Sequence, residues 1–115
     1  MRASLLVAWV LRFIVAVAFF YFGFIHYRDP GYAAQFVVWG YPAGWHQFTS
    51  LIEVIGAVLI IIPTTTLVGV GLLGALLAAA IITLLIHDGG ATVLIPLVVL
   101  VAVAALGWLR WSERV

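Results

Sequence analysis

The stretch Thr49-Ser-Leu-Ile-Glu53-Val-Ile-Gly-Ala-Val-Leu-Ile-Ile-Ile-Pro63 decides the fold of this chain. It is apolar over the length of a helix and contains one carboxylate, Glu53, among aliphatic residues. Such a run suits hydrocarbon, whereas a carboxylate inside a bilayer costs about 2.5–3.5 kcal/mol on insertion scales. We therefore expect a membrane-spanning helix whose carboxylate faces a protein interior, a partner or a ligand rather than lipid.

The composition points to the same environment. Hydrophobic residues make up 67% of the 115 residues and charged residues 8%. Soluble domains typically have about 45–50% apolar residues and about 25% charged residues. The chain is thus predicted to be an integral membrane protein. It contains no cysteine, which excludes thiolate ligation, iron–sulfur clusters and disulfide exchange. A net charge of +1 without a basic run argues against a nucleic-acid partner.

Four apolar segments can each reach the roughly 17–25 residues that cross a bilayer. We predict an all-α membrane protein, an antiparallel four-transmembrane-helix bundle that forms a single domain over residues 1–115. The helices are expected at about 4–26, 45–62, 66–87 and 91–111, with a short interfacial helix at 32–39 in the aromatic-rich first loop. Pro63 should end the second helix, and Pro96 should start or kink the fourth. The first helix is expected to be retained rather than cleaved, because Arg12 interrupts its apolar run.

The arginines predict the orientation. Arg2, Arg110 and Arg114 flank the two termini, whereas Arg28 beside an aspartate is alone at the other side. The positive-inside rule places both termini in the cytoplasm, as four spans require, in what we expect to be a bacterial inner membrane. Arg12 lies about 10 Å nearer the cytoplasm than Glu53 by helical rise. It is therefore expected to snorkel to the inner headgroups rather than pair with Glu53.

Helical spacing predicts the packed faces, because residues three and four apart share one stripe. The first helix carries a stripe of Arg12, Ala16, Phe19, Gly23 and His26, and the second carries Glu53, Gly56, Ala57 and Ile60. The third carries a run of small residues, Gly71, Gly74, Ala75, Ala78 and Ala79. Small residues allow helices to approach closely in a membrane, so this run is expected to face its neighbours.

All three histidines, His26, His46 and His87, lie at the predicted outer interface, and Glu53 lies about 10–12 Å below it. Three interpretations stay open. In the first, Glu53 is a protonated or hydrogen-bonded structural group. In the second, Glu53 is part of a site for a quinone or a similar small lipid. In the third, two or three of the histidines bind a metal ion or a haem near Glu53. No two histidines occur at i, i+4 on one helix, so no metal site is predicted. The candidate cofactor-binding residues are His26, Tyr27, Glu53 and His87, with a quinone as the expected ligand, and no catalytic residue is assigned.

Several short motifs recur in a recognisable order, and they resemble the DoxX-like family of small four-helix membrane proteins. The motifs are Leu11-Arg12, Phe22-Gly-Phe-Ile-His26, Asp29-Pro30, Gly40-Tyr-Pro-Ala43 and Glu53-Val-Ile-Gly-Ala57, and they cover roughly the first three helices. The family commonly carries a lysine where His26 stands. It is named for small subunits of a thiosulfate:quinone oxidoreductase, so the resemblance implies a role beside a membrane redox complex.

The expected function is accordingly an accessory subunit of a quinone-linked membrane redox assembly, with an outward-facing polar site around Glu53. An autonomous enzyme is not expected. The expected partners are the lipid bilayer and either further copies of this chain or other membrane subunits. Two alternatives remain: a small-solute or proton-coupled transporter element, motivated by the intramembrane carboxylate, and a purely structural membrane subunit.

Overall fold

The computed structural model describes residues 3–90 and 92–113, and this part of the chain is helical. The helices are α1 (Ala3–Arg28), α2 (Pro30–Val38), α3 (Trp45–Ile61), α4 (Thr66–Asp88) and α5 (Leu94–Glu113), with a 3₁₀ turn, η1 (Pro63–Thr65), before α4. The predicted helix positions therefore agree to within a few residues. α5 begins two residues before Pro96, so this proline lies in the first helical turn, where its missing N–H is tolerated. The predicted start at residue 91, and Arg2 and Arg114, lie outside the described residues.

Three of the helices are long and apolar enough to cross a membrane: Ala3–Arg28, Pro63–Asp88 and Leu94–Ser112. α3 is also apolar but has 17 residues, or about 25 Å of helix. The molecule is 48 Å along its longest axis, close to the roughly 40–45 Å of a bilayer with its headgroups. Together with the apolar outer surface, these dimensions make the chain a membrane protein.

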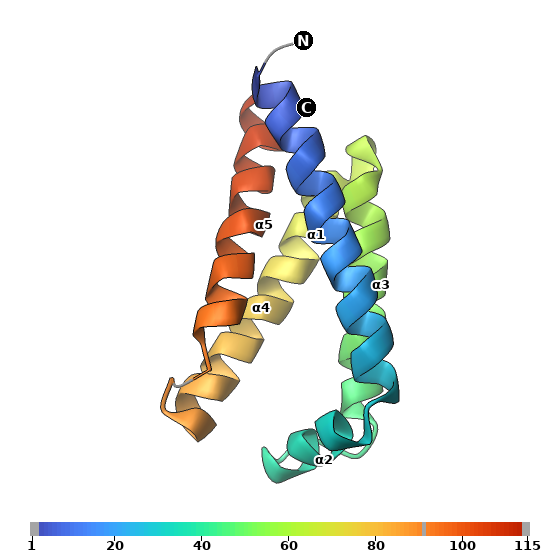
Figure 1. The fold of residues 1–115 in the computed structure, drawn as a ribbon, viewed down its shortest axis with the longest axis vertical. Coiled ribbons are helices and arrows are strands. Elements are labelled where there is room, and N and C mark those ends of the chain that lie inside the picture. The colour runs from blue at the N-terminus through green and yellow to red at the C-terminus, as the bar shows by residue number, and fades with distance from the viewer. Residues whose placement is uncertain (1–2, 91, 114–115) are drawn as a thin grey trace.

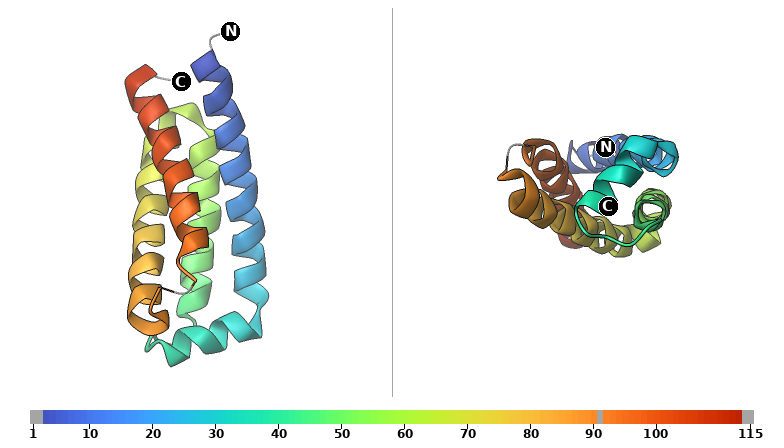
Figure 2. Two further views of the ribbon diagram at one scale, coloured as in Figure 1. Left: turned by 60° about the vertical axis from the view of Figure 1, so that its left-hand side comes forward. Right: turned by 90° about the horizontal axis from the view of Figure 1, so that it is seen from below.

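The four long helices form an antiparallel ring in which α1 packs against α3 and α5, and α4 packs against the same two helices. Both described ends of the chain lie at one end of the molecule (Figure 1). The short α2 runs across the opposite end, beneath the space that the four helices surround (Figure 2). Nine residues are too few to span a bilayer. The side chain of Asp29 caps α2 by accepting a hydrogen bond from the Gly31 N–H at 2.9 Å.

The packed faces of α1 and α3 are those predicted from helical spacing. Arg12, Ala16, Phe19 and Gly23 are buried on α1, as are Glu53, Gly56, Ala57 and Ile60 on α3. The two helices approach closely at Gly23, since a Cβ there would lie 2.7 Å from Val54 Cγ2 and 3.0 Å from the Ser50 carbonyl oxygen. This close approach brings the polar residues of both stripes together.

The prediction for the small-residue run on α4 was wrong. Gly71, Ala75 and Ala78 are exposed, and α4 instead buries Thr66, Gly69, Leu73, Leu77 and Thr83. Gly69 makes the close approach: a Cβ there would lie 3.0 Å from the Gly56 carbonyl oxygen. Leu73 and Leu77 fill the interior on the same face, whereas Gly71, Ala75 and Ala78 are left on the outer surface.

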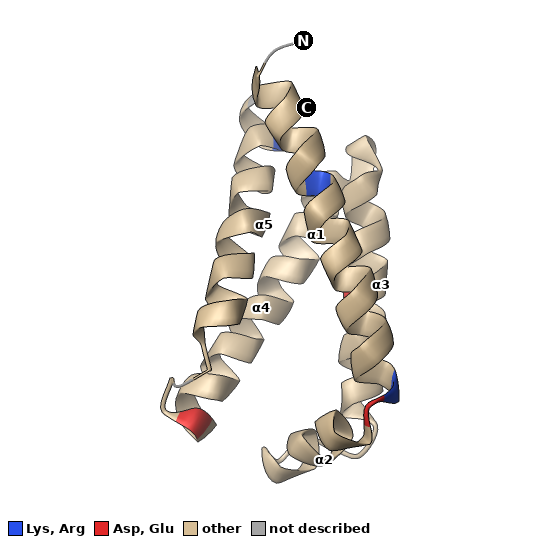
Figure 3. Ribbon diagram, viewed as in Figure 1, with Lys and Arg blue, Asp and Glu red and all other residues tan. Residues whose placement is uncertain are grey.

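The prediction that Arg12 snorkels to the headgroups was also wrong, because its side chain is fully buried. Pro63 has no N–H for the last carbonyls of α3, and a membrane interior requires such groups to be paired within the protein. Arg12 Nε donates to the Ile60 carbonyl at 2.8 Å, and Thr65 Oγ1 donates to the Leu59 carbonyl at 2.8 Å. Arg12 is thus a cationic cap for α3 supplied by α1, within an otherwise nearly charge-free bundle (Figure 3).

Candidate functional site

The predicted polar stripes of α1 and α3 meet in a hydrogen-bonded pair, His26 and Glu53. His26 Nδ1 lies 3.2 Å from Glu53 Oε1. His26 is two residues from the end of α1, whereas Glu53 lies eight residues into α3 and is 4% exposed. The second carboxylate oxygen, Glu53 Oε2, is buried and has no hydrogen-bond partner among the described residues. A buried polar atom of this kind points to an interaction with a group from outside the chain.

Aromatic rings surround the histidine of this pair. The imidazole of His26 is stacked on Tyr32 at a centroid distance of 4.0 Å and on Phe22 at 5.8 Å. Tyr32 and Phe36 are four residues apart on α2, so both rings point to the same side of that helix. Burial raises the pKa of the Tyr32 hydroxyl above its usual range, and the Glu53 carboxylate raises it further. Tyr32 therefore stays a neutral hydrogen-bond donor.

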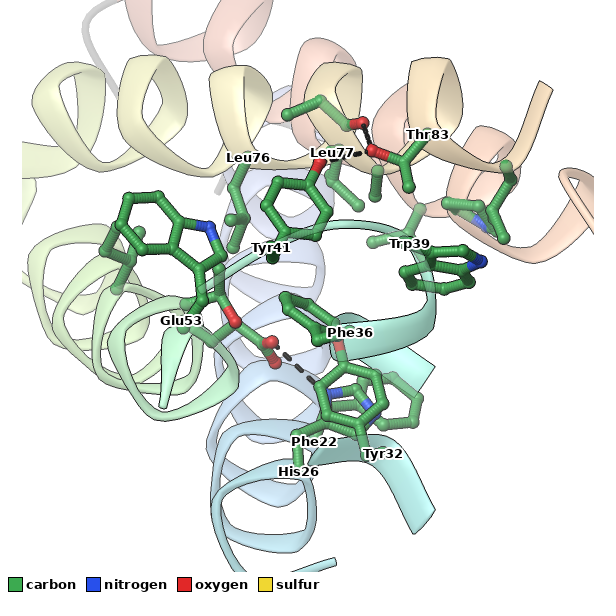
Figure 4. Close-up of a pocket in the computed structure, with 18 of the residues that line it drawn as sticks. Phe22, His26, Tyr32, Phe36, Trp39, Tyr41, Glu53, Leu76, Leu77 and Thr83 are labelled. Carbon is green, nitrogen blue, oxygen red and sulfur yellow. Dashed lines mark hydrogen bonds and ion pairs between the residues drawn. The ribbon is translucent and has the colours of Figure 1, made fainter. Parts of the chain in front are cut away.

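A second polar group links the loop after α2 to α4. The Tyr41 hydroxyl lies 2.6 Å from Thr83 Oγ1, and Thr83 Oγ1 donates to the Ala79 carbonyl at 2.8 Å. Thr83 has one hydroxyl hydrogen, and the Ala79 carbonyl can only accept. Tyr41 must therefore be the donor to Thr83. This chain of hydrogen bonds holds the loop against α4 beside the Glu53 pair (Figure 4).

Between these groups lies a cavity of about 600 Å³, within the roughly 300–1,000 Å³ range of small-molecule sites. It lies inside the helix ring at the end that α2 crosses, and α1, α2, α3, α4 and α5 all contribute to its wall. Its lining is mostly apolar, with eight aromatic side chains around the His26–Glu53 pair: Phe19, Phe22, Tyr32, Phe36, Trp39, Tyr41, Trp45 and Phe48. An apolar cavity with a few convergent polar groups is the usual form of a ligand site.

The family model that matches this chain is that of the DoxX-like family, over residues 10–106. The chain belongs to the DoxX-like family. The match confirms the family predicted from the motifs and extends into α5, beyond the three helices that carry those motifs. Searches of curated proteins and of solved structures found no match.

In this DoxX-like protein, two of the four candidate residues come together. His26 and Glu53 form the hydrogen-bonded pair and line the cavity. Tyr27 lies outside the cavity lining and is 43% exposed. His87 is exposed at the end of α4 and also lies outside the lining, but its ring contacts that of Trp39 at 6.3 Å. Within residues 3–90 and 92–113, no three His, Cys, Asp or Glu side chains are grouped as metal ligands.

Tyr32, Phe36, Tyr41 and Thr83 belong to the cavity but were not recognised from the sequence. One signal for Thr83 was present, since it is the one polar residue in the run from Leu67 to Ile86. A hydroxyl alone in such a run is expected to face the protein interior rather than lipid. The two residues of α2 had no such signal, because interfacial helices are rich in aromatic side chains whatever lies beneath them.

Proposed function

We propose that this DoxX-like protein binds a quinone-type ligand in the aromatic cavity and acts as an accessory subunit of a membrane redox assembly. The observation that carries the proposal is the His26–Glu53 pair, in which Glu53 is buried and has one carboxylate oxygen without a partner among the described residues, in an apolar cavity of about 600 Å³. A quinone is a flat apolar ring with two oxygens. Flat rings stack favourably on aromatic side chains, and the polar pair can hydrogen-bond one oxygen of the ring.

Electron transfer is assigned to a partner subunit. The sequence contains no cysteine, so this chain can supply neither a dithiol couple nor the thiolate ligands of an iron–sulfur cluster. The proposed task of the chain is to hold the ligand in the membrane and to present it to a redox-active neighbour. The exposed apolar surface of α5, which includes Ile95, Val98 and Val101, suits contact with lipid or with another membrane subunit.

Filling the cavity should abolish ligand binding. In Ala80→Phe a ring would occupy space in the cavity lining, whereas in Ala78→Phe the ring would lie on the exposed surface of the same helix. We expect Ala80→Phe to weaken binding of a short-chain quinone or its hydroquinone to the nanodisc-reconstituted protein by about tenfold or more, because the ring and the ligand cannot share the space. Ala78→Phe should bind as the parent does. Equal binding by both variants would place the ligand elsewhere.

The same cavity should matter in the native membrane. Glu53→Gln and His26→Ala are expected to lower quinone-linked activity in membranes that contain the protein and its partners. If both variants leave that activity unchanged, the quinone role fails.

A proton-coupled transporter remains the second candidate, because Glu53 is a buried carboxylate with one unpartnered oxygen. Intramembrane acids often belong to proton relays. Proton-coupled uptake into vesicles that contain only this chain, lost in Glu53→Gln, would favour that function over the accessory one.

The proposed topology has four spans, with α3 as the shortest and both termini in the cytoplasm of a bacterial inner membrane. It is supported by Arg110 in the last turn of α5, the helix that ends where the two termini lie, and by α2 at the other end of the molecule (Figure 1). The absence of native cysteine allows a clean test. We expect Gln35→Cys on α2 to react with a membrane-impermeant maleimide in intact cells, and Ser112→Cys on α5 to react only after permeabilisation. The reverse pattern would invert the topology.

A further inference from the structure

Three of the hydroxyl hydrogens in the cavity wall are already donated to protein acceptors. Thr83 donates to the Ala79 carbonyl, and Tyr41 must then donate to Thr83. Thr49, which also lines the cavity, donates to the His46 carbonyl at 2.9 Å. Each hydroxyl has one hydrogen but two lone pairs. Toward a ligand, these three side chains can therefore only accept hydrogen bonds.

Glu53 adds a stronger acceptor. The proton shared with His26 lies between Nδ1 and Oε1. If it is on His26, the Glu53 side chain is a carboxylate, and if it is on Oε1, then Oε2 is a carbonyl oxygen. In both of these arrangements, which place no proton on Oε2, that atom accepts, and it is the buried atom without a partner among the described residues.

Three further lining side chains carry a hydrogen-bond donor. The Tyr32 hydroxyl and the indole N–H groups of Trp39 and Trp45 belong to α2, its C-terminal cap and the first residue of α3. Glu53 is eight residues further along α3, which is about 12 Å of helical rise. Trp45 is therefore remote from the pair, whereas the Tyr32 ring is stacked on His26 at 4.0 Å and its hydroxyl can donate there, as can His26 Nε2 when that nitrogen carries a hydrogen. Glu53 Oε2 itself is an acceptor without a partner among the described residues.

On the basis of the proposed function, we infer that the site selects the reduced form of its ligand, a hydroquinone, whose O–H donates to Glu53 Oε2. A hydroquinone has two O–H donors, whereas a quinone presents carbonyl oxygens that can only accept. A carbonyl placed against Oε2 would face another acceptor, and both groups would stay unpaired. A site that hydrogen-bonds a particular ligand group strongly rejects an analogue without that group. An apolar pocket rejects an analogue of slightly different shape much more weakly.

Three tetramethyl-benzene ligands separate these effects: the hydroquinone, the quinone, and the 1,4-dimethyl ether, which has the same ring but no O–H. Each is brought to equilibrium by dialysis against the nanodisc-reconstituted protein under argon, and empty nanodiscs give the partition background. The hydroquinone is expected to bind about tenfold or more tightly than either of the others, because only its O–H pairs the otherwise unpaired, buried Oε2.

Glu53→Gln tests the assignment to Oε2. The amide keeps one acceptor but adds an N–H donor that a quinone carbonyl can accept. The hydroquinone preference should fall below about threefold, while the affinity for the dimethyl ether stays unchanged and shows that the cavity is intact. Tyr27→Phe, outside the cavity, is the matched control and should keep the full preference.

The outcomes are distinct. A quinone that binds as well as the hydroquinone overturns the inference and leaves the proposed function standing. A hydroquinone preference that persists in Glu53→Gln removes the role of Oε2. If no ligand binds above the empty-nanodisc background, the proposed function fails as well. If Glu53→Gln does not fold, the comparison of the three ligands on the parent protein still decides the preference.

Discussion

Replacement of Arg12 by methionine is expected to lower the free energy of unfolding by about 3 kcal/mol. The guanidinium is fully buried, donates to the Ile60 carbonyl at 2.8 Å and to Thr66 Oγ1 at 3.2 Å, and lies 4.3 Å from the ring centroid of Trp9. Each hydrogen bond from a charged donor contributes about 1.5–3 kcal/mol. Methionine keeps the apolar stem but has no donor.

The loss cannot be repaired locally. Thr66 Oγ1 is within 3.0 Å of both the Ile60 and the Ile62 carbonyls, yet it has one hydrogen to share between them. Pro63 has no N–H to offer. The end of α3 would therefore have an under-paired carbonyl in an environment without water, where each such group is costly.

Denaturation in mixed micelles, followed by circular dichroism, measures this change. The matched control is Arg110→Met, because Arg110 Nε donates to the Pro63 carbonyl at 2.9 Å in an exposed position. Water or headgroups can replace that bond, so Arg110→Met should cost less than about 1 kcal/mol. Equal costs for the two variants would mean that Arg12 is not a buried cap.

Gly69→Val is expected to destabilise the bundle by about 2–3 kcal/mol. A Cβ at Gly69 would lie 3.0 Å from the Gly56 carbonyl oxygen and 3.0 Å from the Ile60 backbone nitrogen. Both atoms are backbone, so no rotamer change can relieve the overlap and α3 and α4 must separate. Overpacking of this kind typically costs about 1–3 kcal/mol.

Gly74→Val on the same helix is the control. A Cβ at Gly74 meets nothing within 4 Å, and the helix propensity of the substitution is the same at both sites. The control is expected to unfold within about 0.5 kcal/mol of the parent in the same micelle assay. A loss at Gly74 as large as that at Gly69 would mean that the small-residue run of α4 packs against a partner.

Wrong predictions came from residues whose neighbours are remote in the chain. Arg12 is 48 residues from the carbonyl that it caps, and its spacing alone was compatible with both burial and snorkelling. The small-residue run of α4 was predicted to face the interior because its residues are small. The rotation of α4 about its axis instead turns Gly69 and Leu73 toward the interior. That rotation follows from ridges and grooves on α3, which no local pattern in α4 contains.

The sequence by itself determined the membrane class, the helix positions, the family and the packed stripes of α1 and α3. These features follow from hydropathy and from 3.6 residues per turn, both local properties of the chain. It also placed His26 and Glu53 on facing stripes. Only the tertiary structure decided that Tyr41 and Thr83 line the same cavity as His26 and Glu53, and that Tyr27 does not. The contact between Tyr41 and Thr83 connects residues about 40 positions apart in the chain. Such long-range contacts depend on how helices rotate and pack against one another, and they have no period in the sequence.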